Sequence, residues 1–213
     1  MKILMVGRGV IAAQYGWAFE KAGHTVEFYV RPGRAATLGS TLPLHLLDAR
    51  TKTKGVLVNE RWPVQLRESI PVGHTYDLIV VSVQHYQFGE VAAFLAPLIS
   101  NTTVLIFNNF WQDPQEQASA LPAEQLVWGF PQAGGGFDAN GVLTGALFAD
   151  VHFGTFGTDP TPRDLAIRDL FATSGFKLHE HRDFRGWLWI HFAVDAGFFA
   201  EVLRVGSVEG VFH

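Results

Sequence analysis

A glycine-rich turn near the start of the chain holds the residues best suited to chemistry. Gly7 and Gly9 flank one residue, and Ala12 completes a Gly-x-Gly-x-x-Ala pattern directly after an apolar run. Such a turn presents free backbone N–H groups at the positive end of a helix dipole, where a pyrophosphate can bind. Gly7 would permit the tight turn, Gly9 the approach of the phosphate, and Ala12 close helix packing. The pattern predicts a dinucleotide-binding segment formed by Gly7, Arg8, Gly9, Val10, Ile11 and Ala12.

Two arginines follow the next expected strand, at the position that usually distinguishes the two nicotinamide dinucleotides. An acidic residue there binds the ribose 2′-hydroxyl of NAD, whereas an arginine accommodates the 2′-phosphate of NADP. This chain has Arg31 at that position and Arg34 close behind it, while Glu27 lies inside the strand. A guanidinium stays charged and can hold a phosphate through two parallel hydrogen bonds. We therefore expect NADP(H) as the cofactor; the alternative is that both arginines are solvated loop charges.

These residues need strands that bring them to one edge of a sheet. Apolar runs of strand length predict strands at residues 25–30, 76–83 and 102–107, and residues 87–98 have helical spacing. Runs that are apolar throughout are typical of parallel strands covered on both faces. Asn109 follows the last of these strands, at the carboxyl end, where doubly wound sheets place their ligands. The sequence thus predicts an α/β fold with a Rossmann-like, doubly wound, mostly parallel sheet.

The rest of the chain gives mixed signals that predict extra antiparallel strands. Residues 33–53 are polar and lack a clear period, which indicates an irregular stretch. Three consecutive glycines at Gly134–Gly136 indicate a break in the chain, and Asn140-Gly141 is a strong hairpin signal. The further elements expected are strands near residues 55–58, 63–66, 126–130, 142–156 and 177–181 and helices at residues 162–173 and 184–205.

Composition narrows the choice of partner and compartment. The chain of 213 residues has a net charge of −4, which argues against nucleic acid or an anionic membrane as a bulk electrostatic partner. It has no cysteine, so disulfides, thiolate catalysis and zinc–thiolate sites are excluded. There is no apolar run of about 18 residues, and the chain enters a core strand at once, leaving no room for a signal peptide. We expect a cytoplasmic protein.

The last long helix, residues 184–205, is apolar on nearly all sides. Such a helix must be buried or must meet a partner. We therefore expect a nucleotide-binding domain at residues 1–183, and at residues 184–213 an inter-domain helix that begins a largely missing helical domain. An exposed apolar face of this size also predicts a homodimer formed through the helix.

Taken in order, these segments resemble the ketopantoate reductase (2-dehydropantoate 2-reductase) family. The resemblance rests on the opening with its glycine turn, on Arg31, on residues 80–87, on residues 106–109 and on residues 189–195. It implies a Rossmann domain followed by a helical domain, and NADP-dependent reduction of a ketone on a small 2-oxo acid or related substrate. By this resemblance Arg31 holds the 2′-phosphate, and Asn109 lies beside both cofactor and substrate.

The chain lacks lysine at two positions where the family pattern has it. Gln84 stands where the family usually has a lysine, although Gln87 is kept, and the resemblance implies that both lie near the cofactor. The catalytic lysine of the family aligns with His191 and the asparagine after it with Asp195; a register two residues earlier would place Trp189 at the lysine position. In the first register, His191 would donate the proton to the ketone and Asp195, one helical turn later, would orient it.

Three functional interpretations follow. The first is an NADP-dependent oxidoreductase that acts on a small-molecule substrate. The second is a non-enzymatic NADP-binding sensor or degenerate paralogue that has lost the lysine, and the third is a fragment that serves mainly for dimerisation. A metal site is not expected: His179 and His181 share one face of a strand, but no third ligand is visible nearby, and two exposed histidines are the simpler interpretation.

Overall fold

The computed structural model describes residues 1–51 and 54–212. Ten strands form one sheet in the order β4-β3-β9-β8-β7-β6-β1-β2-β5, with β10 beside β9. The strands are β1 (Lys2–Val6), β2 (Thr25–Tyr29), β3 (Thr41–Ala49), β4 (Val56–Pro63), β5 (Leu66–Arg67), β6 (Leu78–Val81), β7 (Thr103–Ile106), β8 (Leu126–Phe137), β9 (Leu143–Gly154) and β10 (Lys177–His181). The α-helices are α1 (Val10–Lys21), α2 (Arg34–Leu38), α3 (His85–Leu95), α4 (Pro114–Gln117), α5 (Pro162–Thr173) and α6 (Phe184–Val205).

The first half of the sheet is parallel, as the sequence predicts. Strands β2, β1, β6, β7 and β8 run side by side in the same direction. All four residues of β6 and all four of β7 are buried, which explains why both strands are apolar throughout. Val6 pairs with Val81, and Val81 pairs with Ile106, so the carboxyl ends of three strands meet at one edge. The Rossmann-like fold class is confirmed.

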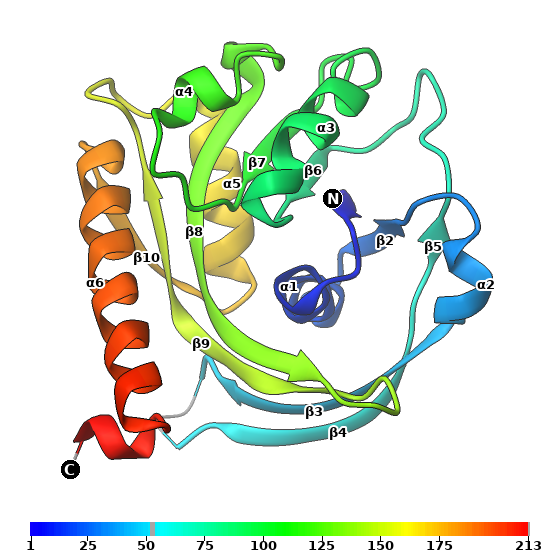
Figure 1. The fold of residues 1–213 in the computed structure, drawn as a ribbon. Helices are drawn as coiled ribbons and strands as arrows, with labels where there is room; N and C mark the ends of the chain where they lie inside the picture. Colours follow the sequence, from blue (N-terminus) through cyan, green and yellow to red (C-terminus); the bar gives the residue numbers. More distant parts are fainter. Residues whose placement is uncertain (52–53, 213) are drawn as a thin grey trace.

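A second group of long strands curves away from the parallel part and passes beneath α1 (Figure 1). Strand β8 belongs to both parts, because it pairs parallel with β7 and antiparallel with β9. Strand β9 then pairs with β3, which forms an antiparallel pair with β4. The turn that joins β8 to β9 contains Gly141 at φ +75°, so the expected hairpin is confirmed.

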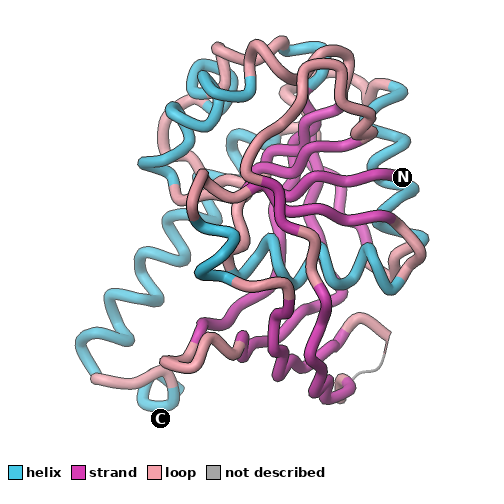
Figure 2. Tube along the Cα trace, turned by 90° about the vertical axis from the view of Figure 1, so that its right-hand side faces the viewer, coloured by secondary structure: helices cyan, strands magenta, loops and turns pink. Residues whose placement is uncertain are grey.

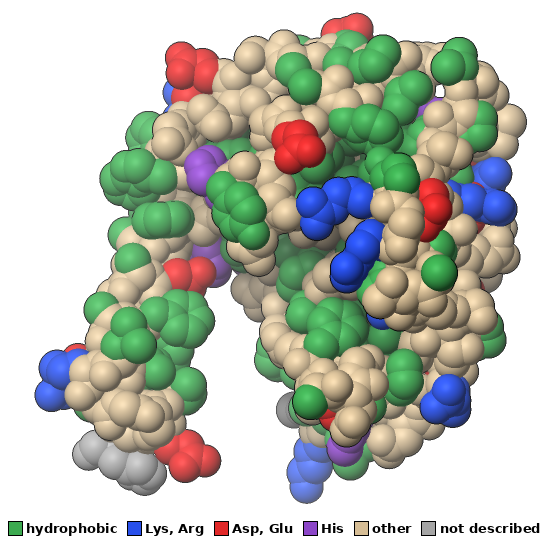
Figure 3. Space-filling model, turned by 45° about the vertical axis from the view of Figure 1, so that its right-hand side comes forward, with side chains coloured by type: hydrophobic (Ala, Val, Ile, Leu, Met, Phe, Trp, Pro, Cys, Tyr) green, Lys and Arg blue, Asp and Glu red, His purple; other side chains and the backbone are tan. Residues whose placement is uncertain are grey.

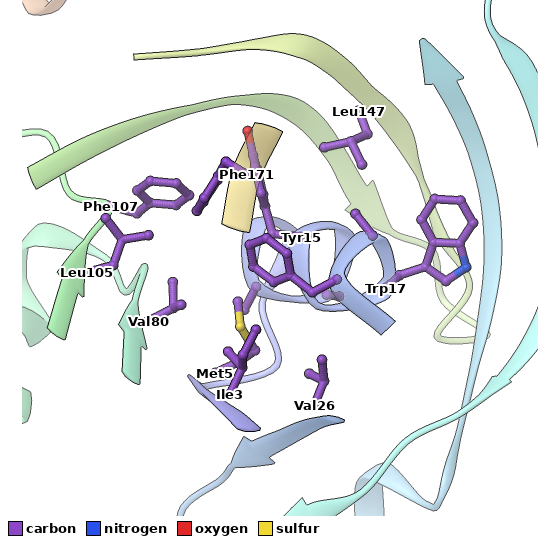
Figure 4. Packing of buried hydrophobic residues seen from close by; sticks show 14 of the residues in the cluster. Ile3, Met5, Tyr15, Trp17, Val26, Val80, Leu105, Phe107, Leu147 and Phe171 are labelled. Carbon is purple, nitrogen blue, oxygen red and sulfur yellow. The ribbon is translucent and has the colours of Figure 1, made fainter. Parts of the chain in front are cut away.

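Helix α1 lies in the concave face of this sheet, and its side chains form the centre of the core (Figure 4). The Tyr15 ring stacks on Phe176 at 5.0 Å and meets Phe107 edge-on at 5.2 Å. Its hydroxyl accepts a 3.0 Å hydrogen bond from the backbone N–H of Gln132 in β8. These contacts fix the start of α1, and with it the glycine turn, against the sheet.

Two local sequence predictions are wrong. Residues 33–51 are not irregular, since they contain α2 and the nine-residue strand β3, while residues 52–53 of the predicted irregular stretch lie outside the described residues. Leu42, Leu44 and Leu46 are buried there and alternate with Pro43 and His45, a period of two that is typical of a strand and was overlooked.

The three glycines at 134–136 do not break the chain either, because they continue β8 and pair with β9. Gly135 lies opposite Gly145, and a Cβ on Gly135 would come within 2.3 Å of the Thr144 carbonyl oxygen. The glycines therefore permit a close approach of two backbones.

Helix α6 begins and ends where the sequence predicts, and it projects away from the sheet (Figure 2). Phe184 and Leu188, in its first two turns, are its buried residues. Most of its remaining large apolar side chains are exposed: Trp189, Ile190, Phe192, Val194, Phe199 and Leu203. No helix in the described part of the chain is long and apolar enough to cross a membrane. The division into domains at residue 184 stays a prediction.

Candidate functional site

A cavity of about 350 Å³ lies at the carboxyl edge of the parallel strands, beside the glycine turn. It is bounded by the turn after β1, the end of β2, helix α2 and one face of α3. Figure 3 shows Lys and Arg side chains gathered beside a hollow on this side of the molecule. The lining residues are Val6, Gly7, Arg8, Tyr29, Val30, Arg31, Arg34, Leu38, Val83, Gln87, Glu90, Val91 and Phe94.

The glycine turn has the geometry that phosphate binding requires. Gly7 has φ +84°, a conformation that favours glycine, and its N–H donates to the Tyr29 carbonyl at 2.8 Å. Gly9 is the N-cap of α1 with φ −76°, which any residue can adopt, and a Cβ there would meet no atom within 4 Å. Nothing in the folded protein therefore requires glycine at position 9, whereas a ligand approaching the helix start would.

Three arginines converge on this cavity: Arg8, Arg31 and Arg34. None of them forms an ion pair within the described part of the chain, and the carboxylate that lines the cavity beside them is Glu90. Arg31 and Arg34 are exposed, while Arg8 is half-buried. Burial lowers the pKa of Arg8 from its usual value. The excess of positive charge makes the cavity suited to an anion.

Part of the cavity lining is aromatic. Tyr29 and Phe94 stack with their ring centroids 4.9 Å apart. Neither residue was predicted as part of the site, although Tyr29 is the last residue of β2. A flat apolar wall next to cationic side chains suits a ring system that carries phosphate groups.

The two glutamines at the start of α3 have different positions. Gln87 lines the cavity, and its Oε1 accepts a hydrogen bond from the Gln84 backbone N–H at 3.3 Å. Gln84 is the N-cap of α3, exposed and outside the cavity lining. The structure thus brings Gln87 to the predicted site and leaves Gln84 at its margin.

Polar atoms without partners lie farther along the same edge of the sheet. Ser82 Oγ, Asn108 Oδ1 and Asn109 Oδ1 are buried and have no hydrogen-bond partner within the described residues. The Asn108 amide donates to the Val83 carbonyl at 2.7 Å, which holds the loops after β6 and β7 together. Buried acceptors are normally paired, so these atoms fit a ligand that donates hydrogen bonds. Ser82 was missed, although it directly follows the central strand β6.

Glu27 does not line the cavity, and its carboxylate is hydrogen-bonded to other side chains. The Arg67 guanidinium donates two hydrogen bonds of 2.9 Å to its carboxylate, and the Tyr76 hydroxyl donates a third at 2.5 Å. The hydrogen bonds from Arg67 hold the pKa of Glu27 below its usual range, against the opposing effect of burial. Glu27 is therefore unavailable as a ribose ligand, as its place inside the strand indicated.

His191 and Asp195 contact each other on α6, but neither lines the cavity. His191 Nε2 lies 3.2 Å from Asp195 Oδ2. The imidazole stacks on Trp187 at 5.1 Å and meets the edge of Phe130 at 4.3 Å. Trp189, the residue of the alternative register, packs instead against Trp111.

The helix itself is tied to the segment that follows Asn109. Arg185 forms an ion pair of 2.5 Å with Asp113, and Phe192 packs against Trp111 at 5.3 Å. The helix that carries His191 and Asp195 is therefore anchored to the loop that begins at Asn109.

A group of stacked histidines lies beneath the same helix. His152 and His181 contact through ring nitrogens 2.9 Å apart, and both rings stack on Trp187. Burial lowers the pKa of His152 to about 4, and the neighbouring histidines add to this effect. His179 and His181 are half-buried, so their interpretation as two exposed histidines is wrong. Within the described residues no cluster of three potential ligands is placed to hold a metal ion.

Comparison with known proteins gives consistent matches. Residues 3–157 match the family model described as ketopantoate reductase PanE/ApbA. An uncharacterized oxidoreductase of Bacillus subtilis, YkpB, is 28% identical over 178 residues, which cover 81% of this chain and 54% of that protein. The chain therefore spans about half the length of this relative.

Two solved structures have the same fold. A dimeric ketopantoate reductase from Staphylococcus aureus has a TM-score of 0.71 at 14% identity, covering 100% of this chain and 72% of that one. A D-mandelate dehydrogenase, solved with NADH and anilino(oxo)acetate, has a TM-score of 0.64 at 19% identity, covering 85% of this chain and 57% of that one.

Proposed function

This chain belongs to the ketopantoate reductase PanE/ApbA family, and we propose that it binds NADP(H) and serves in the reduction of a ketone on a small 2-oxo acid. The observation that carries this proposal is the cavity in which the glycine turn and three unpaired arginines meet at the carboxyl edge of the sheet. Anion-binding helix starts and arginines at the end of the second strand are the elements that recognise a phosphorylated dinucleotide.

The residues present fit the two ends of such a cofactor. The pyrophosphate would lie over the open space at Gly9, and the 2′-phosphate would face Arg31 and Arg34. The nicotinamide end of the cofactor would reach Asn108 and Asn109. Their Oδ1 atoms have no hydrogen-bond partner within the described residues and can accept hydrogen bonds from hydroxyl or carboxamide groups. Gln87 would border the path between the two ends.

We propose His191 as the proton donor to the ketone oxygen. When bound, the nicotinamide supplies the hydride to the carbonyl carbon, and a protein acid must then supply the proton. An imidazolium has two N–H groups. The one at Nε2 faces the Asp195 carboxylate at 3.2 Å, which leaves the N–H at Nδ1 for the substrate. Asp195 would hold the ring in position.

A 2-oxo acid is the substrate class that the comparisons favour. The D-mandelate dehydrogenase of similar fold was solved with anilino(oxo)acetate, which resembles a 2-oxo acid in having a carbonyl group next to a carboxylate. Turnover of NADPH with a panel of 2-oxo acids separates the enzyme from a non-enzymatic NADP-binding sensor. Tight NADPH binding without turnover of any compound would favour the sensor, and failure to bind any nucleotide would favour a dimerisation module.

The cofactor assignment predicts that Arg31→Ala narrows the preference for NADPH over NADH. Loss of a charge-assisted phosphate contact costs about 1.5–3 kcal/mol, which is about tenfold or more in affinity. NADH has no 2′-phosphate, so its affinity should change little. Fluorescence titration of both cofactors against the wild type and the variant measures the ratio of dissociation constants. An unchanged ratio would contradict the role of Arg31.

We further propose that two copies of the chain associate through α6. Ile190, Phe199 and Leu203 are exposed there, with Leu203 84% exposed, and the Staphylococcus aureus relative is dimeric. Sedimentation should show a concentration-dependent dimer that Leu203→Glu weakens. Leu165→Glu on α5, where the leucine is also exposed, is the matched control and should leave association unchanged. A monomer at every accessible concentration would contradict this proposal.

A further inference from the structure

Arg8 differs from the other two arginines of the cavity in its environment. Its side chain is half-buried, and Nε is buried without a hydrogen-bond partner within the described residues. Within the described residues its guanidinium makes one long hydrogen bond, of 3.3 Å, from Nη1 to the Leu38 carbonyl. No carboxylate of the described chain forms an ion pair with it. A cation that is partly removed from water without an anionic partner does not stabilise the free protein.

The contact with Leu38 shows to which end of the cavity the guanidinium of Arg8 extends. Leu38 is the last residue of α2, and Arg34 is the first. Arg8 therefore reaches from the turn after β1 towards the segment that carries the other two arginines. The pyrophosphate position lies elsewhere, over the N–H groups at the start of α1 that follow Gly9.

Solvent exposure determines how strongly each arginine can act on an anion. Arg31 and Arg34 are exposed, so water and salt screen their charges and flexible side chains must be ordered on binding. Arg8 is less screened, and its position is already restricted by burial. A phosphate placed between the three guanidinium groups would gain most from the one that is partly desolvated.

We propose that Arg8 contacts the 2′-phosphate of the cofactor and determines the preference for NADP(H) over NAD(H). This inference rests on the proposed function, and it assigns to the residue between the two glycines a role in recognising the ribose end. On binding, the guanidinium exchanges its long bond to the Leu38 carbonyl for charge-assisted bonds to phosphate oxygens.

Arg8→Gln tests the inference because it removes the charge but keeps a polar side chain. Dissociation constants are measured for NADPH and NADH, and for the fragments 2′-AMP and 5′-AMP. We expect NADPH and 2′-AMP to lose affinity by about tenfold or more, and NADH and 5′-AMP by less than about threefold. Arg8→Lys, which keeps the charge without the planar fork, should fall between the wild type and Arg8→Gln.

Two controls separate this role from a structural one. Arg61→Gln alters an exposed arginine of β4 that does not line the cavity, and it should change no dissociation constant. The melting temperature of ligand-free Arg8→Gln should equal or exceed that of the wild type, because the variant no longer places an unpaired charge in a partly buried position.

The outcomes distinguish the inference from the function on which it rests. If the wild type binds neither NADPH nor NADH, the proposed function and the inference both fail. If the wild type prefers NADPH and Arg8→Gln weakens NADPH and NADH equally, Arg8 contacts the pyrophosphate and the inference alone is overturned. An unchanged affinity for NADPH, or a clear loss of thermal stability in the ligand-free variant, overturns it as well.

Discussion

His191→Ala is expected to lower turnover by about 10²–10⁴-fold while leaving the affinity for NADPH nearly unchanged. The reason is that reduction of a ketone needs an acid at the carbonyl oxygen, and we propose His191, with Asp195 at 3.2 Å, as that acid. The imidazole does not line the cavity, so its removal should spare cofactor binding. Steady-state rates and NADPH titrations on the same preparation measure both quantities.

A second histidine variant separates this role from the general effect of removing a histidine side chain. His45→Ala, at an exposed position in β3, is the matched control and should retain full turnover. Turnover of His191→Ala at the level of the wild type would exclude His191 as the proton donor.

The parallel half of the fold could be predicted from the sequence because each strand is buried on both faces. In β6 and β7 an unbroken apolar run is required, and such a run stands out from any other pattern. The curved half could be predicted less well, since its long strands are partly exposed and carry mixed residues. Strand β3 was missed, and the three glycines of β8 were taken for a break although they serve a close backbone pairing.

The candidate site also has a part that could be predicted from local sequence patterns and a part that could not. The residues that belong to a local pattern, Gly7, Arg8 and Arg31, do line one cavity. The aromatic wall of Tyr29 and Phe94 depends on the distance between β2 and α3, which no local pattern encodes.

The histidines beneath α6 were misjudged for a related reason. His152 comes from β9, His181 from β10 and Trp187 from α6, so their stacking becomes visible only once three segments are placed together. A strand histidine looks exposed in the sequence when the helix that covers it cannot be positioned. The position of His191 relative to the carboxyl edge of the sheet could not be predicted for the same reason, because His191 lies on this helix.

Gly154→Ala is expected to lower the stability of the protein clearly, because Gly154 packs against the first residue of α6. A Cβ at this position would lie 2.6 Å from the His181 carbonyl oxygen and 2.6 Å from the Cβ of Phe184, which is itself buried. Both neighbours are held in place, since the Phe184 N–H donates to the Thr155 carbonyl and the Thr155 N–H donates to the His181 carbonyl. Overpacking of this kind costs about 1–3 kcal/mol, and more when backbone must move.

Chemical denaturation of Gly154→Ala measures the loss, with Gly136→Ala as the matched control. Gly136 also lies in a long strand, but a Cβ there meets no atom within 4 Å, so its stability should stay within about 0.5 kcal/mol of the wild type. The variant also tests whether α6 positions the proton donor. If it does, the folded fraction of Gly154→Ala should turn over substrate more slowly than the wild type while binding NADPH normally. Equal stability of the two glycine variants would show that β9 and α6 do not meet as described.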